Sequence, residues 1–345
     1  MKHLHFILKA TLLLMLATGA TRALAGETFY DNGIYYEVVD YNTVQVVQPD
    51  YYDSYSGDIV IPSTVTAQVS QYYETYELTY TVAGIGANAF QDSYISTITL
   101  PNTIEYISDY AFYGCSYLQE IMLPNSVGSI GEYAFGYCTG LSSFVIPNGV
   151  NYIGWNAFYC CTGLTSVQIS SSVSELGGTF FGCTGLKSVE IPASVRYLDG
   201  TFKNCTSLTS VFIPSSVTNL GYNTFYGCDN LADITCEAET PPYTSDSNSF
   251  PQSVYDLAKL YVPANSVTDY SSASVWNLFV NIFGIGAQVV TGDVDGDGRI
   301  SINDLTILID YILEGAQATP QADIDGDGRI SINDVTMLVD MMLNN

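Results

Sequence analysis

Phenylalanine recurs every 22 or 23 residues through the middle of this 345-residue chain, and this period constrains the fold more than any other feature. The column comprises Phe90, Phe112, Phe135, Phe158, Phe180, Phe202 and Phe225. Three residues after most of them stands a cysteine, at Cys115, Cys138, Cys161, Cys183, Cys205 and Cys228, and a leucine follows each cysteine by three more. A fixed period of this size predicts a solenoid, in which each repeat packs only on its neighbours.

Each repeat also carries one strand-like triplet, such as Leu118-x-x-Ile121-x-Leu123. A proline closes most of these strands, and Ser170 takes its place once. Parallel strands stack about 4.8 Å apart, so seven rungs over residues 84–236 predict a slab roughly 34 Å long. The expected fold class is therefore a β-rich solenoid of short parallel strands, followed by a small α-helical module described below.

The repeat pattern resembles the BspA-like leucine-rich repeats of bacterial surface proteins. The resemblance runs from Ile85 to about Cys236 and rests on motifs such as Ile130-Gly-Glu-Tyr-Ala-Phe-Gly-Tyr-Cys138. It implies an extracellular binding scaffold without fixing a ligand. Gly178-Thr179-Phe180 and Gly200-Thr201-Phe202 depart from the usual Ala-Phe pair, and we expect an altered solenoid curvature there.

The segments that flank the repeats resemble caps, which a solenoid needs at its open ends. Residues 26–83 are rich in tyrosine and β-branched residues, and Ile59-Val60-Ile61-Pro62 already resembles a repeat strand. Residues 237–287 hold a looser unit with a strand at Leu260-Tyr261-Val262-Pro263 and Trp276 in a final helix or turn.

Residues 1–25 have the features of a secretory signal peptide. Lys2 and Lys9 supply positive charge, an apolar run spans Leu12 to Ala17, and Ala23-Leu24-Ala25 is a cleavage motif. The apolar run is too short to span a membrane, and we expect no span elsewhere. The prediction is a secreted protein, extracellular or associated with a cell surface.

Charge and histidine content exclude several functions. The formal net charge is −26 for the whole chain, and cleavage after residue 25 lowers it to −29, which disfavours nucleic-acid binding. His3 and His5 both lie in the signal, so the mature chain has no histidine for a nucleophile pair or a metal site. Only carboxylate chemistry remains, and a glycosidase needs two carboxylates across a sugar cleft that this pattern does not offer. We expect no enzyme activity and no catalytic residues.

Eight cysteines in a secreted chain raise the possibility of disulfides. Six of them occupy one repeat position, Cys236 falls on an inward strand position, and Cys160 alone is out of phase. Neighbouring rungs are close enough for bridges, so disulfides stay open as an alternative. The register favours small, buried, reduced residues.

The outward strand positions form the candidate ligand face, which is small, polar and mostly uncharged. One set is Thr99, Met122, Val145, Gln168, Glu190, Phe212 and Thr235, and the other is Thr97, Glu120, Ser143, Ser166, Ser188, Ser210 and Asp233. This face could bind a protein or a glycan, or be an ordinary solvated surface. The N-terminal tyrosines Tyr51, Tyr52, Tyr55, Tyr72 and Tyr73 could stack on sugars, but cap packing explains them equally well.

Two twelve-residue acidic loops near the C-terminus have the spacing of calcium sites. Side-chain oxygens stand at positions 1, 3, 5, 9 and 12, position 7 offers its carbonyl, and a glycine at position 6 allows the sharp turn. The first loop has Asp293, Asp295, Asp297, Arg299, Ser301 and Asp304, and the second has Asp323, Asp325, Asp327, Arg329, Ser331 and Asp334. We expect each loop to bind one Ca²⁺ and to lead into an amphipathic helix, over Leu305–Leu313 and Val335–Leu343.

The loop pair resembles a type I dockerin, the module that binds cohesin receptors, over residues 292–345, and we place the module at 288–345. A paired EF-hand is the alternative interpretation. An EF-hand has glutamate at position 12 and a helix before each loop, whereas here position 12 is aspartate and we expect no helix before the first loop. The resemblance implies that Ile302-Asn303 and Ile332-Asn333 contact the cohesin. The copies are identical over Gly296–Asp304 and Gly326–Asp334, which permits binding in two orientations.

Together these features predict a secreted, non-catalytic repeat scaffold that a calcium-dependent dockerin attaches to a cohesin-bearing scaffold or cell surface. Two alternatives remain open. The chain could act in polysaccharide degradation, since dockerins often accompany glycosidases, or it could be a host-directed adhesin.

Overall fold

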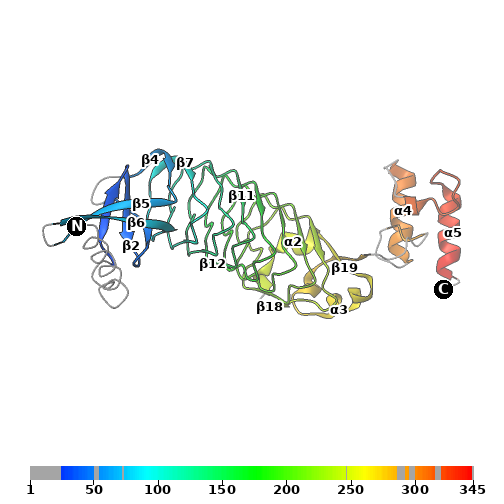
Figure 1. The fold of residues 1–345 in the computed structure, drawn as a ribbon. Helices are drawn as coiled ribbons and strands as arrows, with labels where there is room; N and C mark the ends of the chain where they lie inside the picture. The colour runs from blue at the N-terminus through cyan, green and yellow to red at the C-terminus, as the bar shows by residue number, and fades with distance from the viewer. Residues whose placement is uncertain are drawn as a thin grey trace.

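The computed structural model describes residues 25–49, 54–71, 74–245, 247–285, 292–294, 300–314 and 320–343. The segment predicted as a signal peptide lies outside the described residues except for its last position. Figure 1 shows a β-sheet region at the N-terminal end, a long array of stacked turns, and a pair of helices at the C-terminal end.

The N-terminal cap is a sheet that joins the first turn of the solenoid. Strands β1 (Thr28–Asp31), β2 (Ile34–Val38) and β3 (Thr43–Val47) pair antiparallel, as do β5 (Thr64–Gln71) and β6 (Glu74–Ile85). β6 then runs parallel to β3 on one side and to β8 (Tyr106–Ile107) on the other. The cap thereby hides the sheet edge of the first repeat, as a solenoid end requires.

One parallel strand per turn forms the main ladder, and this confirms the predicted solenoid. Its members are β4 (Ser56–Val60), β7 (Tyr94–Thr99), β9 (Glu120–Ile121), β11 (Ser143–Val145), β13 (Ser166–Gln168), β14 (Ser188–Glu190), β15 (Ser210–Ile213), β17 (Asp233–Cys236), β19 (Lys259–Pro263) and β20 (Asn281–Ile285). The pairing starts one turn before residue 84 and continues two strands beyond residue 236, always in parallel register. The strand-like segments at Ile59–Pro62 and Leu260–Pro263 thus belong to the same ladder.

A second ladder of very short strands, which the sequence pattern did not predict, lies on another side of each turn. It comprises β8, β10 (Ser129–Ile130), β12 (Tyr152–Ile153), β16 (Asn219–Gly221) and β18 (Tyr243–Thr244). The second ladder is interrupted after β12, which has no strand partner on its C-terminal side near the first Gly-Thr-Phe departure. The main ladder is interrupted twice, between β9 and β11 and between β13 and β14, and only the second interruption lies near that departure.

The core is a column of phenylalanine rings. Phe90 and Phe112 stack at 5.1 Å between ring centroids, and the column continues ring on ring to Phe225. Phe250 extends it by one more stacked ring, 5.1 Å from Phe225. Offset stacking at this spacing adds to the burial of large apolar surface, so each turn is stabilised by the next.

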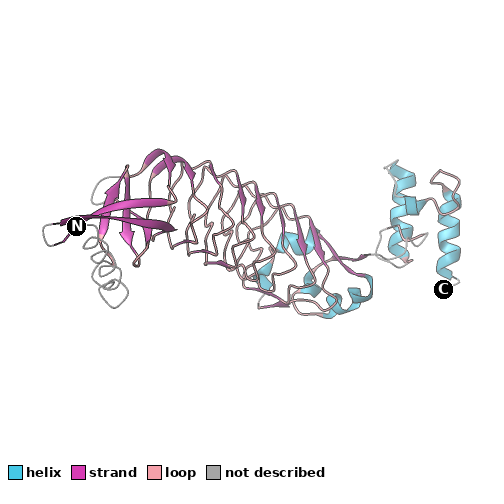
Figure 2. Cartoon of the chain, in the orientation of Figure 1, coloured by secondary structure: helices cyan, strands magenta, loops and turns pink. Residues whose placement is uncertain are grey.

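Helices occur only towards the C-terminal end of the described residues (Figure 2). The last turns contain α2 (Gln252–Leu257), α3 (Val267–Ser272) and short 3-10 segments at Ser247–Ser249, Ala264–Ser266 and Trp276–Leu278. Trp276 is buried and donates its indole N–H to the carbonyl of Pro242 at 2.8 Å. Its ring packs edge-on against Phe250, the last ring of the column, with the centroids 5.9 Å apart.

The C-terminal module has its own small core. Helices α4 (Ile302–Glu314) and α5 (Ile332–Leu343), with a 3-10 turn at Pro320–Ala322 between them, enclose Val294, Leu308, Ala322, Ile324 and Leu338. Both helices begin three residues earlier than predicted, because Ser301 and Ser331 cap them within the loops. No helix in the described part of the chain is both long and apolar enough for a membrane span.

Candidate calcium and partner sites

The second acidic loop gathers three carboxylates at one point. Asp323, Asp325 and Asp327 each place a carboxylate oxygen within 4.8 Å of the others. Like charges at this distance repel by about 1 to 4 kcal/mol per pair, depending on the effective dielectric constant. Such an arrangement is unfavourable by itself and favourable around a cation.

Backbone hydrogen bonds hold each carboxylate in place. The Gly328 N–H donates to Asp323 Oδ2 at 2.9 Å, the Asp327 N–H to Asp325 Oδ1 at 3.0 Å, and the Arg329 N–H to Asp327 Oδ1 at 2.8 Å. Gly326 and Gly328 supply the positive φ angles, +74° and +83°, that this tight path needs.

The other oxygen of Asp323, Oδ1, is buried and accepts no hydrogen bond. A buried carboxylate oxygen without a donor is costly unless a cation satisfies it. The donor set is all oxygen, which is what the hard ion Ca²⁺ prefers. The residues present therefore fit calcium at this loop.

Asp334, at position 12, closes the loop. It is fully buried and accepts backbone N–H bonds from Ile324 (2.7 Å), Asp325 (3.2 Å) and Ser331 (2.8 Å). Burial alone would raise the pKa of this carboxyl, but the donated hydrogen bonds outweigh it and lower the pKa. Asp334 is thus held as a carboxylate, the form that binds a metal ion.

The first loop repeats the closing contacts. Asp304 accepts the N–H of Val294 at 2.8 Å and that of Ser301 at 2.7 Å, matching Asp334 in the second copy. Asp293, at position 1, is buried. The predicted ligands Asp295, Asp297 and Arg299 lie outside the described residues, so only the two ends of this site can be described.

The residues expected to meet a cohesin lie at the exposed starts of the two helices. Ile302 and Ile332 are 64% and 69% exposed, which is unusual for isoleucine on an amphipathic helix. Asn303 and Asn333 are also exposed, and their N–H groups bond the capping serines. Each pair therefore directly follows the acidic loop that holds its candidate calcium ligands.

The candidate face of the main ladder points outward as the alternation predicted. Its residues are exposed, except the half-buried Thr235. Met122 is 77% exposed and Val145 56%. Of the N-terminal tyrosines, Tyr55 is buried and bonded to the Val47 carbonyl at 2.8 Å, which is cap packing, while Tyr51, Tyr52, Tyr72 and Tyr73 lie outside the described residues.

All eight cysteines are free thiols, and the six of the repeat column are buried. Burial raises the pKa of Cys115 and of Cys228 to about 12, so these thiols stay neutral at physiological pH. A neutral buried thiol is a poor nucleophile, and the column has a structural role.

Sequence reasoning missed a hollow on the short-strand side, next to Trp155. The available signal was a substitution within the repeat: Trp155 stands where the two preceding repeats have Asp109 and Glu132. An exposed tryptophan at a repeat position that is otherwise acidic indicates that the surface of this turn differs in function from that of its neighbours.

Comparison with known families agrees with both parts of the fold. Residues 61–181 and 178–278 match the BspA type leucine rich repeat region, in six copies, and residues 291–343 match the dockerin type I domain. No curated protein matched the chain.

Several solved structures are similar to the solenoid. A leucine-rich repeat protein from Bacteroides ovatus is 26% identical, with a TM-score of 0.45, over 68% of this chain and 70% of that one. The T. pallidum leucine rich repeat protein is 22% identical, with a TM-score of 0.38, over 64% and 79%. A leucine rich cell surface protein from Faecalibacterium prausnitzii is 18% identical, with a TM-score of 0.35, over 75% and 95%.

The repeat model spans more than half of the chain and coincides with the strand ladder and the phenylalanine column. The protein therefore belongs to the BspA-type leucine-rich repeat family and carries a type I dockerin domain at its C-terminal end.

Proposed function

We propose that this protein is a secreted, non-catalytic recognition scaffold that binds a cohesin through its dockerin in the presence of Ca²⁺. The observation that carries the proposal is the second loop, whose three gathered carboxylates lie directly before the exposed pair Ile332-Asn333. Calcium bound by the loop would fix the start of α5 and therefore the surface that a cohesin meets.

Two copies of this arrangement support two modes of docking. Asp304 and Asp334 close their loops with the same backbone contacts, and each loop is followed by an exposed Ile-Asn pair. A receptor that fits one copy would fit the other after the module is turned around. Loss of one pair should then weaken binding only about twofold, the statistical effect of losing one of two equivalent modes.

The solenoid would be the recognition part, presenting a surface for a protein or a glycan. The role in polysaccharide degradation would then be one of targeting rather than hydrolysis, and a host-directed adhesin would differ only in its ligand. Binding scaffolds of this kind rely on a rigid extended surface, which the stacked turns supply.

Binding to a panel of recombinant type I cohesin domains, measured by calorimetry on the full chain, tests the proposal. We expect binding in Ca²⁺, none in chelator, and none for the double variant Asp293→Ala/Asp323→Ala. Asp310→Ala, an exposed acid on α4 outside the loops, is the matched control and should bind as the parent does.

The pair variants test the two modes. Changing Ile302-Asn303 to Ala-Ala should leave most of the affinity, whereas changing Ile332-Asn333 as well should abolish it. A chain that binds no cohesin although it binds calcium would overturn the docking role. Release of reducing sugar from a polysaccharide, lost on changing one Asp or Glu, would overturn the non-catalytic role.

A further inference from the structure

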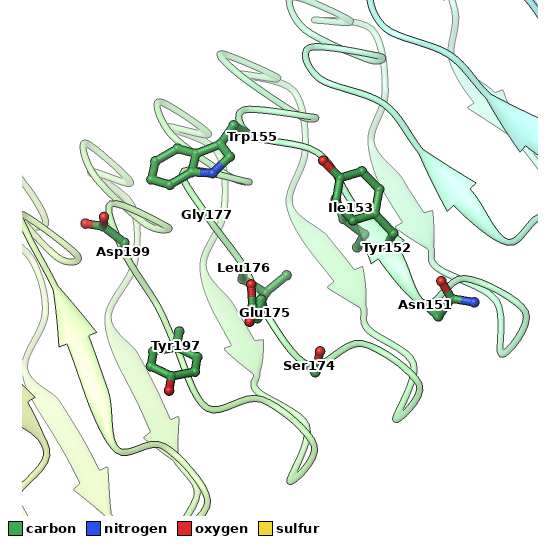
Figure 3. A pocket seen from close by; sticks show the side chains of 10 residues that line it. All are labelled: Asn151, Tyr152, Ile153, Trp155, Ser174, Glu175, Leu176, Gly177, Tyr197 and Asp199. Carbon is green, nitrogen blue, oxygen red and sulfur yellow. The ribbon is translucent and has the colours of Figure 1, made fainter.

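A hollow of about 180 Å³ opens on the short-strand side of the solenoid, across three successive turns (Figure 3). Its walls include Tyr152 and Trp155 from one turn, Glu175 from the next, and Tyr197 and Asp199 from the third. We call it the Trp155 hollow. None of its lining residues belongs to the outward face of the main ladder.

The hollow coincides with a break in the second ladder. In the two preceding turns, the N–H groups of Gly131 and Gly154 bond the carbonyls of Ile107 and Ile130, at 2.8 and 2.7 Å. The equivalent bond from Gly177 to the Ile153 carbonyl does not form among these described residues.

The neighbouring bond is missing as well. Asn151 donates to Gly128 at 3.0 Å, but the Ser174 N–H does not reach the Asn151 carbonyl in the described structure. Ser174, Gly177 and Asn151 all line the hollow, which therefore lies where these two bonds between turns are absent.

Trp155 forms a flat platform at one side. A Cβ atom at Gly177 would lie 2.8 Å from Cε2 of the indole, so the ring rests directly on the backbone of the next turn. The tryptophan is nevertheless 49% exposed. One face of the ring is thus covered by Gly177 and the other is open for stacking, with Tyr152 and Tyr197, 54% and 46% exposed, nearby.

The polar side chains of the hollow comprise two acceptor-only carboxylates, Glu175 and Asp199, and groups that can also donate, such as the Asn151 amide and the tyrosine hydroxyls. Glu175 makes no hydrogen bond or ion pair within the described residues, and Figure 3 shows it between the two tyrosines. Asp199 uses Oδ1 to accept the Tyr222 N–H at 2.7 Å.

We propose that the Trp155 hollow binds one uncharged sugar ring of a longer glycan. A sugar presents an apolar ring face, which fits an open indole, and hydroxyls that both donate and accept, which fit the mixed polar groups. Sites for whole small molecules hold about 300–1,000 Å³, so a hollow of about 180 Å³ suits a single ring of a chain that extends beyond it. Glu175 and Asp199, on a chain of net charge −26, disfavour uronic acids and sulfated sugars.

A cationic peptide side chain is the main competitor, because aromatic rings and carboxylates also attract cations. A cation offers no acceptor, however, so it would leave the Asn151 amide and the hydroxyls of Ser174 and the tyrosines without a partner for their donor groups. A sugar hydroxyl can accept from them while donating to Glu175. The mixture of free donors and acceptors therefore favours the sugar.

This inference rests on the recognition role proposed for the solenoid. Its test does not involve cohesin, so the glycan site can be disproved without disproving cohesin docking, and the reverse. The full chain is titrated by calorimetry with neutral xylo-, cello-, manno- and galacto-oligosaccharides, with oligogalacturonates, and with a tri-arginine peptide. We expect binding of at least one neutral series and none of the acidic one. Trp155→Ala should weaken that binding at least tenfold.

Two further variants test whether binding depends on the position of the Trp155 ring rather than on exposed aromatic rings in general. Gly177→Ala, which pushes a methyl group under the indole, should also weaken binding at least threefold. Tyr117→Ala removes a 59% exposed ring that does not line the hollow and should leave binding unchanged. Binding of the peptide instead of neutral sugars, sugar binding that survives Trp155→Ala, or no binding by any probe would each overturn the proposal.

Discussion

The thiol of Cys138 donates a hydrogen bond to the carbonyl oxygen of Phe112, one turn earlier in the solenoid, with the sulfur and oxygen 3.1 Å apart. The same contact joins Cys115 to Phe90 at 2.9 Å and Cys161 to Phe135 at 3.0 Å, and it continues through Cys228. The two columns that mark the sequence period are therefore linked physically: the thiol of each turn gives a second hydrogen bond to the phenylalanine carbonyl of the turn before, which already accepts a backbone N–H.

Replacing Cys138 by alanine should destabilise the solenoid by about 2 kcal/mol. The change removes a fully buried sulfur and one of the two hydrogen bonds that the Phe112 carbonyl accepts, the other coming from the Cys115 N–H. Urea unfolding followed by circular dichroism measures the loss. Cys160→Ala, at the half-buried cysteine outside the column, is the control and should cost less than about 0.5 kcal/mol. Equal effects at both positions would show that the column has no special role.

The period was predictable because each turn contributes one ring, one thiol and one strand, and each needs a particular residue type. Other features leave no such mark. Phe250 continues the ring column after a step of 25 residues, so a search at 22 or 23 stops at Phe225. The two-residue strands such as Tyr106–Ile107 arise from the stacking of turns rather than from a local pattern, so they could not be predicted.

The acidic loops were predictable for a different reason: every candidate ligand lies within twelve consecutive residues, so the spacing alone indicates the geometry. The helix starts were misplaced by three residues because Ser331 caps α5 while Asp334 accepts the Ser331 N–H in return. The substitution at Trp155 marked the position of the hollow in the sequence, but the missing backbone bonds between turns leave no mark in the repeat pattern, so the hollow itself was not predicted.

Stability should fall as the pH rises above about 9. The pKa of Cys115 and that of Cys228 are raised by burial from an ordinary value near 9 to about 12. The stabilisation that these buried neutral thiols contribute is fully present below the pKa of the unfolded thiols. It is lost between about pH 9 and 12, because in that range the thiols of the unfolded chain ionise while those of the folded chain stay protonated. The slope is at most about 1.4 kcal/mol per pH unit for each thiol.

Equilibrium unfolding from pH 8 to 11 tests whether the free energy of unfolding falls as the pH rises. Buried tyrosines such as Tyr55, whose pKa is raised by burial to about 12, also make stability fall with rising pH. The unsubstituted protein alone therefore does not show how much of the decline comes from the thiols. The double variant Cys115→Ala/Cys228→Ala should be less stable at pH 8 yet show a shallower decline. An unchanged decline would mean that the thiols do not contribute.

Thiol titration of the denatured protein, purified under oxidising conditions, should find all eight cysteines free. The column thiols are buried and neutral, and thiol–disulfide exchange requires an accessible thiolate. Mass spectrometry of peptides from the unreduced protein independently shows whether any two cysteines are joined by a disulfide. Bridges between successive column cysteines, such as Cys161 and Cys183, would contradict the hydrogen-bonded column.

Calcium should supply much of the folding free energy of the dockerin. Residues 292–345 carry ten Asp and one Glu against two Arg, and the small core around Leu308 and Leu338 cannot offset strong repulsion among the gathered carboxylates. We expect this module to lose its helices in chelator and to fold on binding two Ca²⁺ per chain, whereas the solenoid keeps its melting temperature. Calorimetry gives the stoichiometry, and ellipticity at 222 nm reports α4 and α5.

Single substitutions make that test specific to each loop. Asp323→Ala removes the ligand whose Oδ1 is buried without a donor, so the stoichiometry should drop from two to one. Asp293→Ala together with Asp323→Ala should bind none and remain unfolded over residues 292–345 in Ca²⁺. Asp310→Ala removes an equal charge from the exposed side of α4 and should keep both sites. Helical signal indifferent to chelator in the parent, or two ions still bound by the double variant, would show that the ions are held elsewhere and that the loops are acidic turns.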